Sequence, residues 1–89
     1  MMDTTLRVLI VDDEDDFRET IVTRLNARKI QSEGAASGVK ALEVLKDKDF
    51  DVIVLDVKMP DMDGIETLRH IKKMKPEIEV IMLTGHASV

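Results

Sequence analysis

Short apolar runs alternate along the chain with stretches in which apolar residues recur every three or four positions. Runs of the first kind predict β-strands, and stretches of the second kind predict amphipathic helices. The predicted strands are Leu6–Val11, Ile30–Ala36, Val52–Leu55 and Ile78–Leu83. The predicted helices are about Asp15–Arg28, a helix that follows Ser37 as its N-cap, and a helix that carries Ile65, Leu68, Ile71 and Met74. This alternation predicts an α/β fold with a parallel sheet, right-handed crossovers and helices on both faces.

Two of the strands rest on different kinds of support. Ile30–Ala36 has little apolar pattern and is assigned by its position between two helices. Val52–Leu55 (VIVL) is a continuous apolar run between Asp51 and Asp56, which is typical of a strand buried on both faces.

Composition and charge narrow the class of protein. With 89 residues the chain is long enough for one small domain, and its 44% hydrophobic and 35% charged residues fit a globular protein. The absence of cysteine excludes disulfides and thiolate metal sites. The net charge of -5 disfavours direct contact with nucleic acid or an anionic membrane, and no apolar run reaches the length of a membrane span. Residues 1–6 carry no signal-peptide pattern, so we expect a cytoplasmic protein.

Polar side chains follow three of the predicted strands. Asp12 and Asp13 end the first strand, Asp56 the third and Thr84 the fourth. In open parallel sheets, ligands bind beyond the carboxyl ends of the strands. If these strands are neighbours, three carboxylates crowd one crevice and repel each other unless a cation joins them. Oxygen ligands without Cys or His favour Mg²⁺, and one of the carboxylates can then attack phosphorus as a nucleophile.

Three motifs give the chain its resemblance to a known family. VLIVDDE (residues 8–14), DVIVLDVKMPDMDG (51–64) and VIMLTGHA (80–87) occur in the order found in response-regulator receiver domains. The chain resembles this family over essentially its whole length. The resemblance implies a flavodoxin-like, doubly wound parallel sheet with strand order 2-1-3-4-5.

The resemblance also implies roles for four residues of the acidic crevice. Asp56 would receive the phosphoryl group, and with Asp13 it would bind Mg²⁺ directly. Asp12 would act through a metal-bound water, and the backbone carbonyl of Lys58 would complete the metal ligands from the protein.

Two further positions follow from the fourth strand. The resemblance implies that Thr84 hydrogen-bonds the phosphoryl group as a switch residue, and that His86 tunes hydrolysis of the acyl phosphate. Family members continue with a fifth strand that carries a phosphoryl-binding Lys, and no lysine follows the fourth strand here. We therefore expect residues 1–89 to form a receiver domain that is incomplete at its C-terminus.

The resulting hypothesis is a phosphoacceptor switch that is not itself an enzyme, although it assists its own phosphorylation and dephosphorylation. Its expected partners are a sensor histidine kinase and an output domain or downstream protein. Regulation of transcription is one such output. One alternative is a phosphatase with an Asp nucleophile, but such enzymes need a second acid where this chain has Lys58. The other alternative is a receiver-like module that serves dimerisation without phosphorylation.

Overall fold

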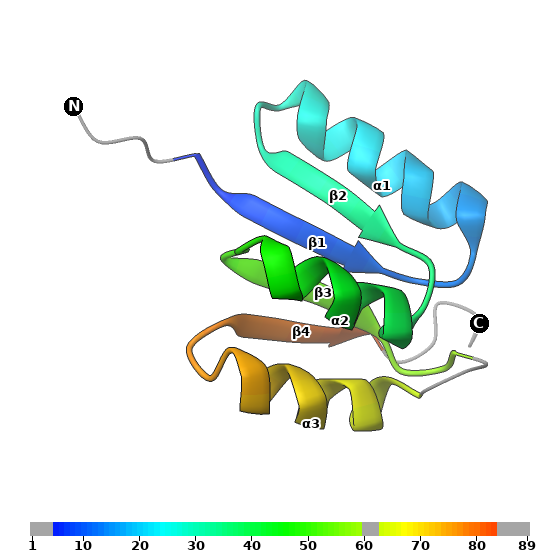
Figure 1. Cartoon of the computed structure of the whole chain (residues 1–89). Helices are drawn as coiled ribbons and strands as arrows, with labels where there is room; N and C mark the ends of the chain where they lie inside the picture. Colours follow the sequence, from blue (N-terminus) through cyan, green and yellow to red (C-terminus); the bar gives the residue numbers. More distant parts are fainter. Residues whose placement is uncertain (1–4, 60–62, 84–89) are drawn as a thin grey trace.

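A computed structural model of the chain describes residues 5–59 and 63–83. Its elements alternate between strands and helices, as the sequence predicts (Figure 1). The strands are β1 (Arg7–Val11), β2 (Gln31–Ala35), β3 (Val52–Asp56) and β4 (Glu79–Leu83). The helices are α1 (Asp15–Ala27), α2 (Gly38–Asp47) and α3 (Gly64–Met74).

The described strands form one parallel sheet in the order β2-β1-β3-β4. This order agrees with the flavodoxin-like fold and confirms the predicted fold class. Because β1 and β3 are neighbours, with Val11 opposite Leu55, the residues that follow them emerge at the same edge of the sheet. The order of the strands therefore brings the acidic residues at the ends of β1 and β3 close together.

The two faces of the sheet are covered unequally. Helices α2 and α3 contact each other and cover one face, over a buried cluster that includes Leu9, Ile53, Leu55 and Ile71. Helix α1 lies on the opposite face, mainly over β2, where Ser32 donates a hydrogen bond from its hydroxyl to the Val22 carbonyl oxygen. Since side chains alternate along a strand, Leu9 and Val11 face this cluster, whereas Val8 and Ile10 are buried on the opposite face.

The face under α1 is less well covered. No residue of α1 itself is buried. On β3, Val52 and Val54 are only half-buried, so the expectation of burial on both faces is correct for one face alone. The reason is that α1 lies over β2 and β1 and leaves the β3–β4 half of this face open.

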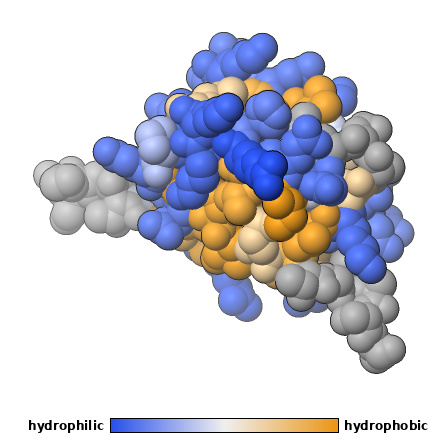
Figure 2. Space-filling view, turned by 90° about the horizontal axis from the view of Figure 1, so that it is seen from below, coloured by the Kyte–Doolittle hydropathy of each residue, from blue (hydrophilic) through white to orange (hydrophobic). Residues whose placement is uncertain are grey.

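Strand β4 ends the described sheet and carries an apolar edge. Ile81 is 52% exposed, and its neighbours Val80, Met82 and Leu83 are half-buried. Figure 2 views the molecule from the side of β4 and α3 and shows an apolar patch bordered by polar residues. An exposed apolar edge strand is a template for pairing with a further strand.

The helix termini bear out the local signals in the sequence. Ser37 is the N-cap of α2 and accepts a hydrogen bond from the Lys40 amide, as predicted. Asp63 caps α3 in the same way through the Glu66 amide. Among the described helices, none combines the length and apolar composition needed to cross a bilayer.

Candidate metal centre at the carboxyl edge of the sheet

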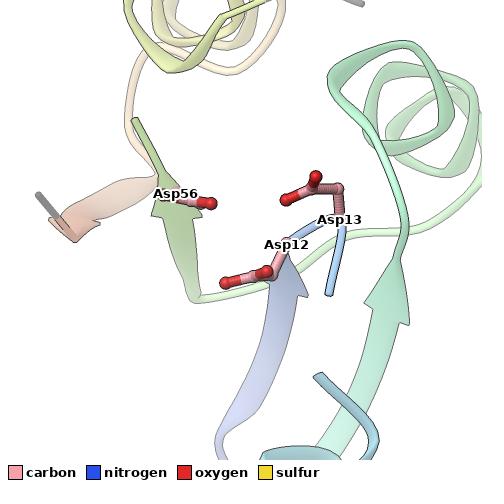
Figure 3. Close-up of side chains that lie close together, drawn as sticks. All are labelled: Asp12, Asp13 and Asp56. Carbon is pink, nitrogen blue, oxygen red and sulfur yellow. The ribbon is translucent and has the colours of Figure 1, made fainter. Parts of the chain in front are cut away.

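Three carboxylates converge where β1 and β3 end. One oxygen of each of Asp12, Asp13 and Asp56 lies within 4.8 Å of the others (Figure 3). Asp12 and Asp13 directly follow β1 and Asp56 is the last residue of β3, and the three side chains point toward a common space. Asp12 and Asp56 are 1% and 3% exposed, whereas Asp13 is open to solvent. The structure thus brings together the three acids that the sequence singled out.

Backbone hydrogen bonds hold the segment that carries Asp12 and Asp13. The Asp12 amide donates to the Ala35 carbonyl at 3.1 Å, which extends the pairing of β1 with β2 by one residue. The Asp12 carboxylate accepts from the Glu14 amide at 2.8 Å through Oδ1. These bonds fix the turn between β1 and α1, so the acids have a defined place before any ligand binds.

Asp56 is held in a similar way at the end of β3. Its Oδ1 accepts a hydrogen bond from the Lys58 amide at 3.2 Å. The amide of Val57, the residue after Asp56, donates to the Leu83 carbonyl at 3.0 Å and continues the pairing with β4. A carboxylate with one oxygen engaged by its own loop presents the other oxygen in a fixed direction.

The loop after Asp56 packs directly against the first residue of α3. The Gly64 amide donates to the Val57 carbonyl at 2.8 Å. A Cβ on Gly64 would lie 2.4 Å from the Asp56 carbonyl oxygen and 2.6 Å from the Val57 Cα. Both neighbours are backbone atoms, so this close approach requires glycine.

The donor set fits Mg²⁺. Oxygen ligands of Mg²⁺ lie about 2.1 Å from the ion, so two ligands on opposite sides are about 4.2 Å apart. The span of up to 4.8 Å among the three oxygens is slightly larger. This spacing allows direct binding by some of the carboxylates and contact through water by another, which is the usual mixture for Mg²⁺.

Beside the acids lies an open depression wide enough for a small ligand. It is lined by Asp13 and by residues of the loop after β3 and of the start of α3, namely Val57, Lys58, Met59, Asp63 and Ile65. Met59 is buried and belongs to the hydrophobic cluster under α2 and α3. Thr84 and His86, which the sequence also singled out, lie outside the described residues.

Sequence reasoning missed three residues that shape the site. Gly64 supports the loop of Asp56, and its signal was the Asp-Gly pair at a helix start. Arg18 donates from Nη1 to the Asp12 carbonyl at 2.9 Å, and its stem lies against Gly34 of β2. No sequence signal marks the Arg18–Gly34 contact, because the two residues meet only after α1 docks on the sheet.

The order of the strands and the acid cluster at their ends are those of a receiver-type fold, and comparison with known families agrees. The profile of the response regulator receiver domain matches residues 8–89. The chain therefore belongs to the response regulator receiver domain family, whose members are signalling domains of two-component systems rather than classical enzymes.

Two curated relatives match the chain over a small part of their own length. The chain is 43% identical over 82 residues to the sensor kinase CckA of Brucella abortus, covering 90% of this chain and 9% of the kinase. It is 36% identical over 83 residues to the regulatory protein AtoC of Escherichia coli, covering 93% of this chain and 18% of that protein. The chain thus spans less than a fifth of either relative.

Solved structures show the same fold at similar identity. The response regulator TrrA of Thermotoga maritima, in complex with Mg²⁺ and BeF, is 31% identical with a TM-score of 0.84, covering 93% of this chain and 72% of that one. A CheY-like receiver domain of Methanospirillum hungatei is 32% identical with a TM-score of 0.88, covering 97% of this chain and 69% of that one.

Proposed function

We propose that the chain is a phosphoacceptor switch in which Asp56 receives a phosphoryl group from a phosphohistidine of a sensor histidine kinase. The observation that carries this proposal is the convergence of Asp12, Asp13 and Asp56 at one edge of the sheet. Family membership and the Mg²⁺–BeF complex of TrrA support it.

The transfer is a displacement at phosphorus. A carboxylate oxygen of Asp56 forms the new P–O bond while the P–N bond to the donor histidine breaks, and the histidine leaves as a neutral imidazole after taking up a proton. The product is an acyl phosphate on Asp56. The Lys58 amide, which donates to Oδ1, holds the carboxylate so that its other oxygen faces the donor.

Mg²⁺, when bound, would offset the negative charge of the carboxylates and of the transferring phosphoryl oxygens. Asp13 and Asp56 would hold it directly, Asp12 through a water, and Lys58 through its backbone carbonyl. Burial of Asp12 and Asp56 strengthens their electrostatic attraction to a cation, because the surrounding apolar core screens charge poorly.

Two further residues complete the proposed switch. Thr84 would hydrogen-bond the phosphoryl group through its hydroxyl and so register occupancy, and His86 would tune hydrolysis of the acyl phosphate. Their place after β4 supports this, because the Val57 amide bonds to Leu83 and so keeps the end of β4 beside the Asp56 loop.

The proposed site belongs to a larger switch. An output domain or downstream protein would read the phosphorylated state. The relative AtoC is named a regulatory protein, and the match to this chain covers 18% of its length. The apolar edge of β4 supports the proposal that residues 1–89 are part of a larger receiver domain, whose next strand covers this edge. In an isolated 89-residue chain, a second copy would take that place.

Acetyl phosphate with Mg²⁺, followed by intact mass, tests the acceptor. We expect a gain of about 80 Da that requires Mg²⁺ and is lost in Asp56→Asn, because an amide is not the nucleophile. Asp47→Asn removes the same charge from the exposed end of α2 and serves as the matched control, which should react like the parent. A stable adduct on Asp56→Asn would refute the assignment.

A further inference from the structure

The side chain of Arg18 lies against the segment that carries the acids. Arg18 is the fourth residue of α1, and its side chain is 13% exposed although it is charged. Its Nη1 donates to the Asp12 carbonyl at 2.9 Å, and its Nη2 donates to the Asp15 carboxylate at 2.8 Å. The planar guanidinium thus bridges the last residue before Asp13 and the first turn of α1.

The Asp12 carbonyl belongs to the peptide unit that leads into Asp13. The peptide unit before Asp12 is already fixed, because the Asp12 amide donates to Ala35 on β2. Arg18 fixes the unit after it. With both peptide units held, the direction in which the exposed Asp13 side chain leaves the backbone is determined.

Gly34 gives Arg18 its place on the sheet. A Cβ at this position of β2 would lie 2.9 Å from Cδ, 3.0 Å from Cγ and 3.2 Å from Nε of Arg18. These distances are shorter than ordinary van der Waals contacts, so a methyl group at Gly34 would displace the stem of Arg18. The stem is flexible, so Arg18 rather than the backbone would move.

We propose that Arg18 is a positioning residue of the metal site and that Gly34, which has no side chain, leaves the space that Arg18 occupies on the sheet. Arg18 orients Asp13 through the Asp12 carbonyl and does not itself bind the metal. This inference rests on the proposed function, since it assumes that Asp13 holds Mg²⁺.

Two effects of Arg18 on metal affinity have opposite signs. Its hydrogen bond orients a ligand and strengthens binding, whereas its positive charge repels a cation and weakens binding. Arg18→Ala removes both effects, so its result alone is ambiguous. Gly34→Ala keeps the charge and disturbs only the placement of Arg18, and it therefore isolates the positioning effect.

The experiment is a double-mutant cycle on Mg²⁺ affinity. MgCl₂ is titrated into the parent, Gly34→Ala, Arg18→Ala and the double variant, and the amide resonances of Asp13 and Lys58 are followed by NMR. Groups bonded directly to metal-ligand side chains contribute about 10- to 100-fold to affinity. Arg18 acts less directly, through the peptide between Asp12 and Asp13, so Gly34→Ala should weaken binding about three- to tenfold. In the Arg18→Ala background, the same change should alter affinity by less than about twofold.

Arg18→Lys gives a second readout that does not depend on Gly34. It retains the charge but loses the fork that reaches Asp12 and Asp15 together, so it should also weaken Mg²⁺ binding. Parent-like affinity in both Gly34→Ala and Arg18→Lys would overturn the inference. So would an equal loss from Gly34→Ala with and without Arg18, because the change would then act through the strand.

Failure of the proposed function is a distinct result. In that case the parent would show no saturable Mg²⁺ response, or Asp13→Ala would bind like the parent. If the parent binds and Asp13→Ala does not, the site stands and the Arg18 variants decide the positioning role alone.

Discussion

Replacing Gly64 with alanine tests how tightly α3 supports the acceptor loop. The new Cβ would lie 2.4 Å from the Asp56 carbonyl oxygen, whereas carbon and oxygen normally stay about 3.3 Å apart. The helix start and the loop would have to separate by about 0.9 Å. The Gly64 amide would then lie beyond hydrogen-bonding distance of the Val57 carbonyl, from which it is now 2.8 Å.

The stability cost follows from these distances. The lost hydrogen bond costs about 1 kcal/mol and the overpacking about 1 to 3 kcal/mol. The lower entropy of the unfolded alanine chain returns less than about 1 kcal/mol. The free energy of unfolding should fall by about 1 to 4 kcal/mol, which lowers the Tm of a domain this size by about 5 to 30 °C. Urea and thermal denaturation followed by circular dichroism would measure it.

The control for Gly64→Ala is Gly38→Ala. Gly38 is likewise the first residue of its helix and follows an N-cap that accepts from the backbone three residues on. It reports what a methyl group costs at this helical position. If the two variants lose the same stability, the close approach of Gly64 to Asp56 is not what constrains this position.

Two predictions concern the rest of the molecule. The isolated 89-residue chain should self-associate through β4. Ile81→Lys should shift it toward monomer in sedimentation velocity, because a charge on this strand blocks edge pairing. A monomeric parent with one cooperative melt at micromolar concentration would contradict this. The Lys75 ammonium, hydrogen-bonded to Asp49, lowers the pKa of that carboxyl below its usual 3.8. The Lys75–Asp49 ion pair therefore stabilises the folded protein above pH 3.8, and this stabilisation is lost as the pH falls through the lowered pKa of Asp49. The free energies of unfolding of the parent and Lys75→Gln, measured in urea, should therefore converge in acid. A difference that is constant from neutral to acid pH would rule this linkage out.

The elements of the fold could be predicted because their signals are local. Apolar runs, the Ser37 cap and the helical period of α3 gave strands and helices whose ends differ by one residue or so from those observed, as with Leu6–Val11 against Arg7–Val11. Strand β2 was hardest, since its sequence QSEGA lies at a sheet edge with one neighbouring strand and Ser32 bonded to α1. Such an edge position places little demand on hydrophobicity.

The candidate site was predictable in its acids and not in its supports. Asp12, Asp13 and Asp56 follow strands that the topology makes neighbours, so their convergence follows from strand order. The contact of Arg18 with Gly34 depends on how α1 rotates as it docks, which no periodicity specifies. Whether the three acids act as assigned remains a prediction for the titrations described above.

The absence of buried residues in α1 affects how easily this helix separates from the sheet. A helix without a buried residue can leave the sheet while the core under α2 and α3 stays dry, so local opening of α1 costs less than global unfolding. Each opening carries Arg18 away from Asp12 and releases the peptide before Asp13. A cation that binds only the ordered acids would favour the docked helix, and by thermodynamic reciprocity a protein that grips α1 would raise the affinity for the cation.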